Sequence, residues 1–271
     1  MKRSKLLAHI SDVHFGREDP ELVEGLIEAL VDAAPDVIVV SGDLTQRARK
    51  RQFRAAQRFL RQLPEVPKII VPGNHDVSTT NLMERALRPL ARYRRYITDD
   101  LAPFYADDEV AIAGINTVRV LSTKDGRINS RQVAAACEQM QRAPEQAVRV
   151  VVTHHPMDLP LEDRKHALVA RSGMAIRQFA RCGIDLFLSG HLHTGLSIPT
   201  SVRYKILGYG AIVVHAGTAV STRTRGQTNA WNLIRLEGES VQIQQMAWGG
   251  RRFSKARVDR YKKGTNGWEP Q

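Results

Sequence analysis

The feature that most constrains the fold is a series of short apolar, mostly β-branched runs separated by longer amphipathic stretches. Such runs, bounded by polar residues, are typical of buried strands. Between the first two runs, Asp19 and Pro20 provide an N-cap and a first helical residue, and an apolar helical face follows. The alternation predicts an α/β protein. We expect strands over residues 6–11, 36–41, 68–71, 110–115, 148–153 and 185–189.

The pattern changes after residue 200, where strand-like runs follow one another with little helix between them, as in antiparallel pairing. We expect two sheets packed face to face with helices outside, in one domain that covers residues 1–247. Residues 248–271 contain seven Lys and Arg residues, and we expect a basic, partly ordered C-terminal tail there. The later strands are expected over residues 203–207, 211–215, 230–236 and 241–246.

The chain is strongly basic, with 40 Lys and Arg against 28 Asp and Glu and a net charge of +12. This balance favours an anionic partner: a nucleotide, nucleic acid or an acidic membrane surface. Because no apolar run is as long as a membrane span and the start lacks a signal-peptide pattern, we expect a cytoplasmic protein, with a peripheral position at the membrane as the alternative. Cys137 and Cys182 lie far apart and indicate neither a disulfide framework nor a cysteine metal site.

Two segments concentrate arginine. Residues 47–63 predict a helix with apolar residues on one face, and its other face is interpreted as a solvated basic surface. Residues 85–95 are interpreted as a packed helix, with contact to an anionic membrane as the alternative. The basic face of the first helix consists of Arg47, Arg51, Arg54, Arg58 and Arg61.

Polar side chains follow the ends of the predicted strands, and six of the nine histidines stand just after such ends. Loops that leave the carboxyl ends of strands converge on one crevice, which is where ligands bind in α/β proteins. Gly42, Gly73 and Gly190 each precede a candidate ligand, where the lack of a Cβ permits a sharp turn and a close approach. The polar residues after the strands are Asp12, His14, Asp43, Asn74, His75, His154, His155, His191 and His193.

Carboxylate and amide oxygens mixed with imidazoles suit divalent transition-metal ions such as Mn, Fe, Zn, Ni or Co, and the lack of thiolates argues against a structural zinc site. Seven ligands are too many for one ion, but they suit two ions that share a carboxylate. The sequence therefore predicts a dinuclear metal site. Its candidate ligands are Asp12, His14, Asp43, Asn74, His154, His191 and His193.

The stretches DVH, GD, GNHD, HHP and GHLH, between residues 12 and 193, resemble the motifs of the calcineurin-like metallophosphoesterases. The resemblance implies a four-layer α/β/β/α sandwich of two mixed β-sheets flanked by helices, with the dinuclear site at the strand ends. It implies that Asp43 bridges the two ions and that His75 is a catalytic residue facing the substrate. Asp12, His14 and His193 would complete the first metal site, and Asn74, His154 and His191 the second.

The resemblance also implies a mechanism, in which a metal-bridging hydroxide attacks a phosphodiester while His75 stabilises charge or protonates the leaving oxygen. Many phosphomonoesterases of the family carry an aspartate at the position of Gln46. The stretch GDLTQR is closer to the class III cyclic-nucleotide phosphodiesterase branch, so we expect a phosphodiester that is nucleotide-like, with a 3',5'-cyclic nucleotide as the candidate.

Other functions remain open from the sequence. A UDP-2,3-diacylglucosamine-type diphosphatase at the membrane surface and a nuclease are alternatives, whereas a non-catalytic scaffold is disfavoured because all seven candidate ligands are present. Candidate substrate-binding residues are His155, Arg223 and Arg225, and a polar hairpin loop is the alternative for the two arginines. We expect Asp76 to orient His75 or the loop backbone, and we interpret His9, His166 and His215 as structural.

Overall fold

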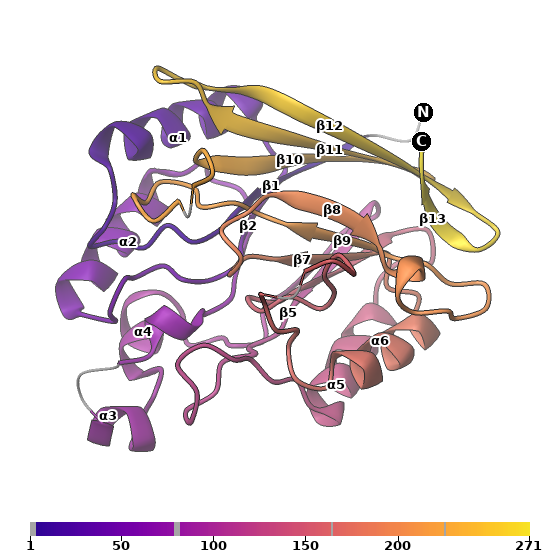
Figure 1. Cartoon of the computed structure of the whole chain (residues 1–271), viewed down its shortest axis with the longest axis horizontal. Coiled ribbons are helices and arrows are strands. Elements are labelled where there is room, and N and C mark those ends of the chain that lie inside the picture. Colours follow the sequence, from indigo (N-terminus) through magenta and orange to yellow (C-terminus); the bar gives the residue numbers. More distant parts are fainter. Residues whose placement is uncertain (1–3, 79–81, 164, 225) are drawn as a thin grey trace.

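The computed structural model describes residues 4–78, 82–163, 165–224 and 226–271. In this part of the chain, two mixed β-sheets pack face to face and helices cover their outer faces (Figure 1). The strand orders are β13-β12-β11-β10-β1-β2-β3 and β4-β5-β6-β7-β9-β8. The four-layer sandwich expected from the sequence is thereby confirmed.

The first sheet contains β1 (Lys5–Ile10), β2 (Val37–Val40), β3 (Lys68–Ile70), β10 (Ala230–Glu237), β11 (Ser240–Trp248), β12 (Phe253–Gly264) and β13 (Gly267–Pro270). The second contains β4 (Phe104–Ala106), β5 (Val110–Gly114), β6 (Val148–Val152), β7 (Leu186–Ser189), β8 (Leu196–Pro199) and β9 (Ile212–His215). The helices are α1 (Pro20–Ala33), α2 (Lys50–Gln62), α3 (Leu82–Leu87), α4 (Ala91–Tyr96), α5 (Ser130–Met140) and α6 (Ser172–Arg181), with short 3₁₀ turns at Asn74–Asp76 and Thr200–Val202.

Strand β2 shows why its sequence suits the inside of a sandwich. Its four residues are all buried because each face of the strand packs on a different layer. Val37 and Val39 point into the core between the sheets, whereas Ile38 and Val40 pack on the side of α1 and α2. A third cluster lies between the second sheet and helices α5 and α6. The continuous apolar runs of the sequence thus belong to strands covered on both faces.

Parallel pairing sets the place of the site. Strands β1, β2 and β3 run parallel to one another, as do β5, β6, β7 and β9, so their carboxyl ends lie together at one edge of each sheet. The two edges are adjacent, since His154 Nδ1, after β6, donates a 2.8 Å hydrogen bond to Ser41 O, after β2. The polar residues that follow these strands therefore face a common crevice.

The C-terminal segment corrects one expectation. Residues 253–264 and 267–270 do not form a partly ordered tail but the strands β12 and β13, which extend the first sheet at its edge (Figure 1). Tyr261 and Trp268 are buried in the core between the sheets, whereas most basic residues of β12 point to solvent. The abundance of charge in this segment concealed a half-buried edge strand.

Other expectations also needed correction. Residues 203–207 form a loop with one isolated bridge, between Ile206 and Tyr209, and the antiparallel partner of β9 is β8 instead. Residues 85–95 span two short helices, α3 and α4, since Pro89 falls between them. Cys137, in α5, and Cys182, directly after α6, form a disulfide, because the fold brings their Cα atoms to 5.6 Å despite a sequence separation of 45.

Candidate metal centre

The seven predicted metal ligands come together in one cluster, and all of them except the partly exposed His191 are buried. A first group surrounds Asp12. Its Oδ1 atom lies 3.5 Å from His14 Nε2 and 3.7 Å from His193 Nε2. The same His14 Nε2 lies 3.6 Å from Asp43 Oδ2. Asp12, His14, Asp43 and His193 therefore turn their donor atoms towards a common point.

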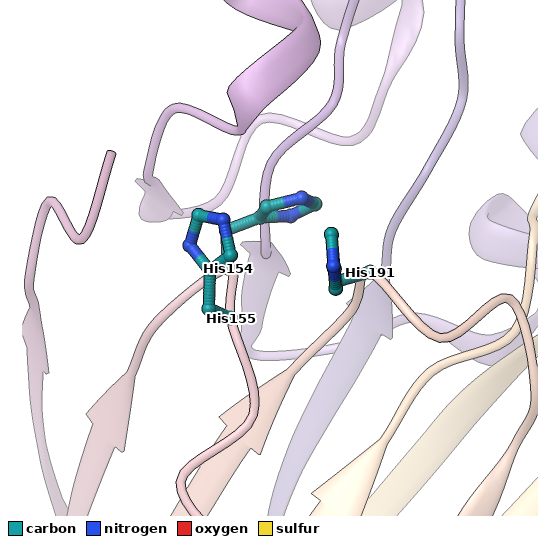
Figure 2. Close-up of side chains that lie close together, drawn as sticks. All are labelled: His154, His155 and His191. Atoms are coloured by element: carbon teal, nitrogen blue, oxygen red, sulfur yellow. The ribbon is translucent and has the colours of Figure 1, made fainter. Parts of the chain in front are cut away.

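A second group lies on the other side of Asp43. Asp43 Oδ2 is 3.4 Å from His154 Nε2. Asn74 Oδ1 is 3.1 Å from both His154 Nε2 and His191 Nδ1. Figure 2 shows His154 and His155 on the loop after β6 and His191 on the neighbouring loop, with their rings close together. One oxygen of Asp43 thus lies beside both groups.

The donor atoms fit metal ions better than they fit each other. Asp12 Oδ1 and both ring nitrogens of His14 are buried and have no hydrogen-bond partner among the described residues, an arrangement that is costly unless another group binds them. Separations of 3.4 to 3.7 Å are too long for hydrogen bonds. They are at or slightly above the separation of two ligands that each lie about 2.1 Å from the same ion, which is about 3.0 to 3.4 Å, so a small inward shift of the side chains would let them share an ion. The residues present therefore fit a pair of divalent ions.

The protonation states of the carboxylates suit cation binding. Burial alone would raise the pKa of Asp12, but the His193 and His14 side chains outweigh it and hold that pKa well below its ordinary value. Burial likewise opposes ionisation of Asp43, and the neighbouring imidazoles, with His154 first, still lower its pKa. Both carboxylates are therefore ionised at neutral pH and can act as metal ligands.

The imidazoles differ among themselves. Burial, reinforced by His154, lowers the pKa of His191 to about 3, so this ring is neutral. Burial also disfavours a charge on His154, but the carboxylates of Asp43 and Asp12 outweigh it and raise the pKa of His154 to about 9. A divalent ion would take the place of that proton, because a ligating imidazole must be neutral.

The loops that carry the ligands have an unusual backbone. Asp12, His14, Asp43, His191 and His193 all have positive φ angles, between 46° and 71°. For non-glycine residues this conformation costs about 1–2 kcal/mol each, and such residues cluster at functional sites. Hydrogen bonds between the loops hold them: Asp12 N donates to Gly42 O over 3.1 Å, and His14 N donates to Asp43 O over 3.0 Å. The fold thus maintains strain where the candidate ligands lie.

The three glycines predicted from the sequence allow this close packing, and a Cβ at Gly190 would lie 2.5 Å from Asp12 Oδ2. Gly42 has a φ of +96°, and a Cβ there would lie 2.6 Å from His154 Nδ1. A Cβ at Gly73 would lie 2.1 Å from Asp43 Oδ1. Any side chain at one of these positions would therefore push a candidate ligand out of place.

Further hydrogen bonds orient the candidate ligands. Thr218 Oγ1 donates to Arg223 O over 3.1 Å, so it accepts the 2.6 Å hydrogen bond from His193 Nδ1. The Nε2 lone pair of His193 is then directed at the cluster. Ser11 Oγ donates to Asp12 Oδ2 over 2.7 Å. Thr218 was not among the predicted site residues, because a threonine in a polar loop has no distinctive sequence signal.

His75, the predicted catalytic residue, lies half-buried at the mouth of the cluster. Its backbone N donates to Asp43 Oδ1 over 2.8 Å, and its Nδ1 donates to Gln46 O over 2.8 Å. Its Nε2 is left to accept from Arg223 Nη1, 3.1 Å away. Burial lowers the pKa of His75 although the Asp43 carboxylate opposes this shift, so the ring is neutral.

Asp76 binds the loop backbone, as expected from the sequence. Its carboxylate accepts hydrogen bonds from Gly73 N, Leu44 N and Thr45 N at 3.0, 3.2 and 2.9 Å, and another from Thr45 Oγ1 at 2.9 Å. These contacts join the loops after β2 and β3, which carry Asp43 and Asn74.

A cavity of about 450 Å³ opens over the cluster, and His75, His155, His166 and Arg223 help to line it. His155 also contacts the protein through both ring nitrogens, at 2.8 Å from Thr117 Oγ1 and 3.0 Å from Lys124 O. Arg225 lies outside the described residues. His9 and His215 are buried away from the cavity, as expected, but His166, interpreted as structural, lies at its wall.

The chain matches the family model of the calcineurin-like phosphoesterases over residues 6–195. It therefore belongs to the calcineurin-like phosphoesterase family, as its motifs implied. Within the part of the chain that the structure describes, none of the helices combines the length and the apolar character needed to cross a membrane.

Similar sequences include two named proteins. The chain is 30% identical over 173 residues to the glycerophosphodiester phosphodiesterase GpdQ of Enterobacter lignolyticus (strain SCF1), a match that covers 57% of this chain and 58% of that protein. It is 25% identical over 210 residues to a transmembrane protein with metallophosphoesterase domain of Danio rerio, covering 72% of this chain and 42% of that protein. The chain thus matches less than two thirds of the length of these relatives.

Solved structures show the same fold at low sequence identity. A dimetal phosphatase from Danio rerio superimposes with a TM-score of 0.65 and 13% identity, covering 94% of this chain and 98% of that one. A purple acid phosphatase from yellow lupin (Lupinus luteus) seeds gives a TM-score of 0.67 and 12% identity, covering 95% and 54%. The sandwich architecture is therefore shared well beyond recognisable sequence similarity.

Proposed function

We propose that the protein hydrolyses a phosphodiester at a dinuclear metal centre. The observation that carries this proposal is the place of Asp43 Oδ2, which lies 3.6 Å from His14 Nε2 and 3.4 Å from His154 Nε2, between the two donor groups. Asp12, His14 and His193 would hold one ion and Asn74, His154 and His191 the other, with Asp43 shared. When bound, such a pair of ions supplies Lewis acidity and lowers the pKa of a water molecule.

The side chains of the protein would position and stabilise the phosphoryl group. Arg223 can donate two parallel hydrogen bonds to phosphate oxygens. His75 lies next to Arg223 and to Asp43, so it faces the same space above the cluster. Because both residues line the cavity of about 450 Å³, a phosphate that occupies the cavity would meet them together.

A diester is favoured over a monoester for two reasons. The named relative with 30% identity is a glycerophosphodiester phosphodiesterase, and Gln46, a neutral residue, stands where many monoesterases of the family carry an aspartate. A 3',5'-cyclic nucleotide remains the candidate from the motif resemblance. A diacylglucosamine substrate is less suited, because Ala167 is the one residue with an aliphatic side chain among the described residues that line the cavity, so no large apolar side chain is present there to pack on acyl chains.

A substrate panel tests the proposal. Purified protein supplied with Mn²⁺, and in parallel with Fe²⁺, Zn²⁺, Ni²⁺ or Co²⁺, would be assayed on bis(p-nitrophenyl) phosphate, cyclic AMP, a glycerophosphodiester, single-stranded DNA and p-nitrophenyl phosphate. We expect metal-dependent hydrolysis of diesters at a kcat/KM above that of the monoester. A preference for the monoester would contradict the assignment, and retained hydrolysis in His75→Ala would remove His75 from the catalytic site.

A further inference from the structure

A second cavity, of about 430 Å³, lies beside the candidate metal centre and is strongly basic. Gln46 and Arg223 line it, and Arg223 also lines the cavity above the metal centre. The two cavities therefore meet at the Arg223 side chain. We call the second one the arginine pocket; its arginines are Arg17, Arg47, Arg49, Arg51 and Arg223.

The arginine pocket is built from the same loops that carry the candidate ligands. Arg17 follows His14 by three residues, and its backbone N donates to His14 O over 2.9 Å. Arg47, Arg49 and Arg51 lie on the segment that runs from Asp43 into α2, and Arg223 lies on the loop before β10. In Figure 1 this loop lies near α1 and α2. The backbone of these arginines is thereby held close to the metal centre.

Hydrogen bonds hold the backbone of the arginine pocket in place. The carbonyl oxygen of Arg17 accepts from Thr222 N over 2.9 Å and from Ser221 Oγ over 3.2 Å. The side chain of Gln52, buried in the first turn of α2, accepts from Arg47 N over 2.9 Å and from Arg49 N over 3.2 Å. The basic side chains therefore extend from an ordered frame.

The positive charge of the arginine pocket is not neutralised by the protein. None of its five arginines forms an ion pair within the described residues, and the first turn of α2 has no acidic residue. The nearby Glu18 carboxylate accepts from Gly16 N. Five like charges and a helix N-terminus around one cavity repel each other unless an anion binds between them.

We propose that the arginine pocket binds a second phosphate group of the substrate while the scissile phosphate occupies the metal centre. The substrate would then be a phosphodiester that carries at least one further phosphate, as a phosphorylated nucleotide or an oligonucleotide does. This inference rests on the proposed function and narrows its substrate class to phosphodiesters with a further phosphate, since a substrate with a single phosphate leaves the arginine pocket empty.

The basic face of the helix predicted over residues 47–63 lines the arginine pocket only in part. Arg47 and Arg51 line the arginine pocket, whereas Arg58 and Arg61, near the other end of α2, do not. All four are exposed. Two double variants, Arg47→Gln with Arg51→Gln and Arg58→Gln with Arg61→Gln, therefore remove the same charge from the same region, but only the first alters the arginine pocket.

The test compares two substrates that differ by one phosphate: thymidine 5'-(p-nitrophenyl phosphate) and the same compound with a 3'-phosphate. For the unaltered protein with Mn²⁺, we expect kcat/KM to be about tenfold higher for the 3'-phosphorylated compound, through charge-assisted hydrogen bonds. The ratio should fall to about one in R47Q/R51Q and stay near tenfold in R58Q/R61Q. A p-nitrophenyl ester of an oligothymidylate is the third substrate. A kcat/KM above that of the 3'-phosphorylated compound would indicate that the natural substrate is a polymer and not a small phosphorylated nucleotide.

Two outcomes would overturn the inference: an unaltered protein that does not distinguish the two compounds, or equal loss of the preference in both double variants. Diester hydrolysis would then stand without the second phosphate site. Titration calorimetry with thymidine 3',5'-bisphosphate and thymidine 5'-monophosphate tests the arginine pocket independently of hydrolysis. If hydrolysis is absent but the bisphosphate binds about tenfold more tightly, and R47Q/R51Q removes that difference, the arginine pocket stands and the proposed function fails.

Discussion

Arg223 Nη1 lies 3.1 Å from His75 Nε2, although 148 residues separate them in the sequence. Because His75 Nδ1 donates to Gln46 O, its Nε2 is the acceptor in this contact. The pair places a permanent positive charge beside a neutral imidazole at the mouth of the metal centre. Arg223 also lines both the cavity above the metal centre and the arginine pocket, so a substitution at Arg223 affects both proposed sites.

The first prediction concerns Arg223. Arg223→Gln should lower kcat for bis(p-nitrophenyl) phosphate by about 10- to 100-fold, because a donor to the phosphoryl oxygens is lost. Arg223→Lys should have a kcat between those of Arg223→Gln and the unaltered protein, since an ammonium carries the charge but cannot form two parallel hydrogen bonds. Steady-state kinetics with matched metal content checks both, with Arg61→Gln as the control. A change in KM alone would mean that Arg223 binds the substrate without stabilising the transition state.

The second prediction concerns Thr218. Thr218→Val removes the acceptor for His193 Nδ1, and we expect metal affinity to fall by about 10- to 100-fold. Thr224→Val, in the same loop, is the matched control and should leave the affinity as it is. Competition with a chelator, followed by elemental analysis, measures the difference. Equal affinity in both variants would show that Thr218 does not orient a ligand.

The third prediction separates backbone strain from steric overlap at glycine. Gly42 and Gly208 have φ angles of +96° and +68°, but a Cβ at Gly208 meets nothing within 4 Å. Gly208→Ala should cost only the conformational term, about 1–2 kcal/mol of unfolding free energy. Gly42→Ala should cost more and should also lower metal content, because its Cβ displaces His154. Denaturant unfolding together with metal analysis tests this; equal effects would exclude the steric account.

The fourth prediction tests the place of the C-terminal strands. Trp268 is buried, and its Nε1 donates to Asp185 Oδ1 over 2.8 Å. Trp268→Ala should lower the free energy of unfolding by about 3–5 kcal/mol. Glu269→Ala, at the exposed neighbouring position, should change it by less than about 0.5 kcal/mol. A small effect of Trp268→Ala would restore the interpretation of this segment as a tail.

The sequence predicted the part of the fold in which local pattern and burial agree. Strand β2 is apolar throughout because both of its faces are covered, and Asp43 follows it at the sheet edge. Strand β12 was missed because its buried Tyr261 is surrounded by exposed basic residues, a pattern that also suits a disordered segment. Its pairing with β11 depends on contacts that no local pattern reveals.

For the candidate site, too, the sequence predicted what local pattern reveals and missed what depends on packing between distant segments. The spacing of residues along the chain identified the cluster from Asp12 to His193, since each candidate ligand follows a predicted strand. It could not reveal the disulfide of Cys137 and Cys182, the support of His193 by Thr218, or the meeting of Arg47 and Arg223 at one cavity. Each of these depends on how separate elements pack, and packing is not encoded in a single stretch of residues.

The most direct test of the central claim is the metal content of Asp43→Ala. If Asp43 is shared by two ions, the unaltered protein should bind two divalent ions per chain, and Asp43→Ala should lose most of both together with hydrolysis of bis(p-nitrophenyl) phosphate. Asp107→Ala, which removes a carboxylate paired with Lys5, should retain both ions. An Asp43→Ala protein that keeps two ions and full activity would contradict the account.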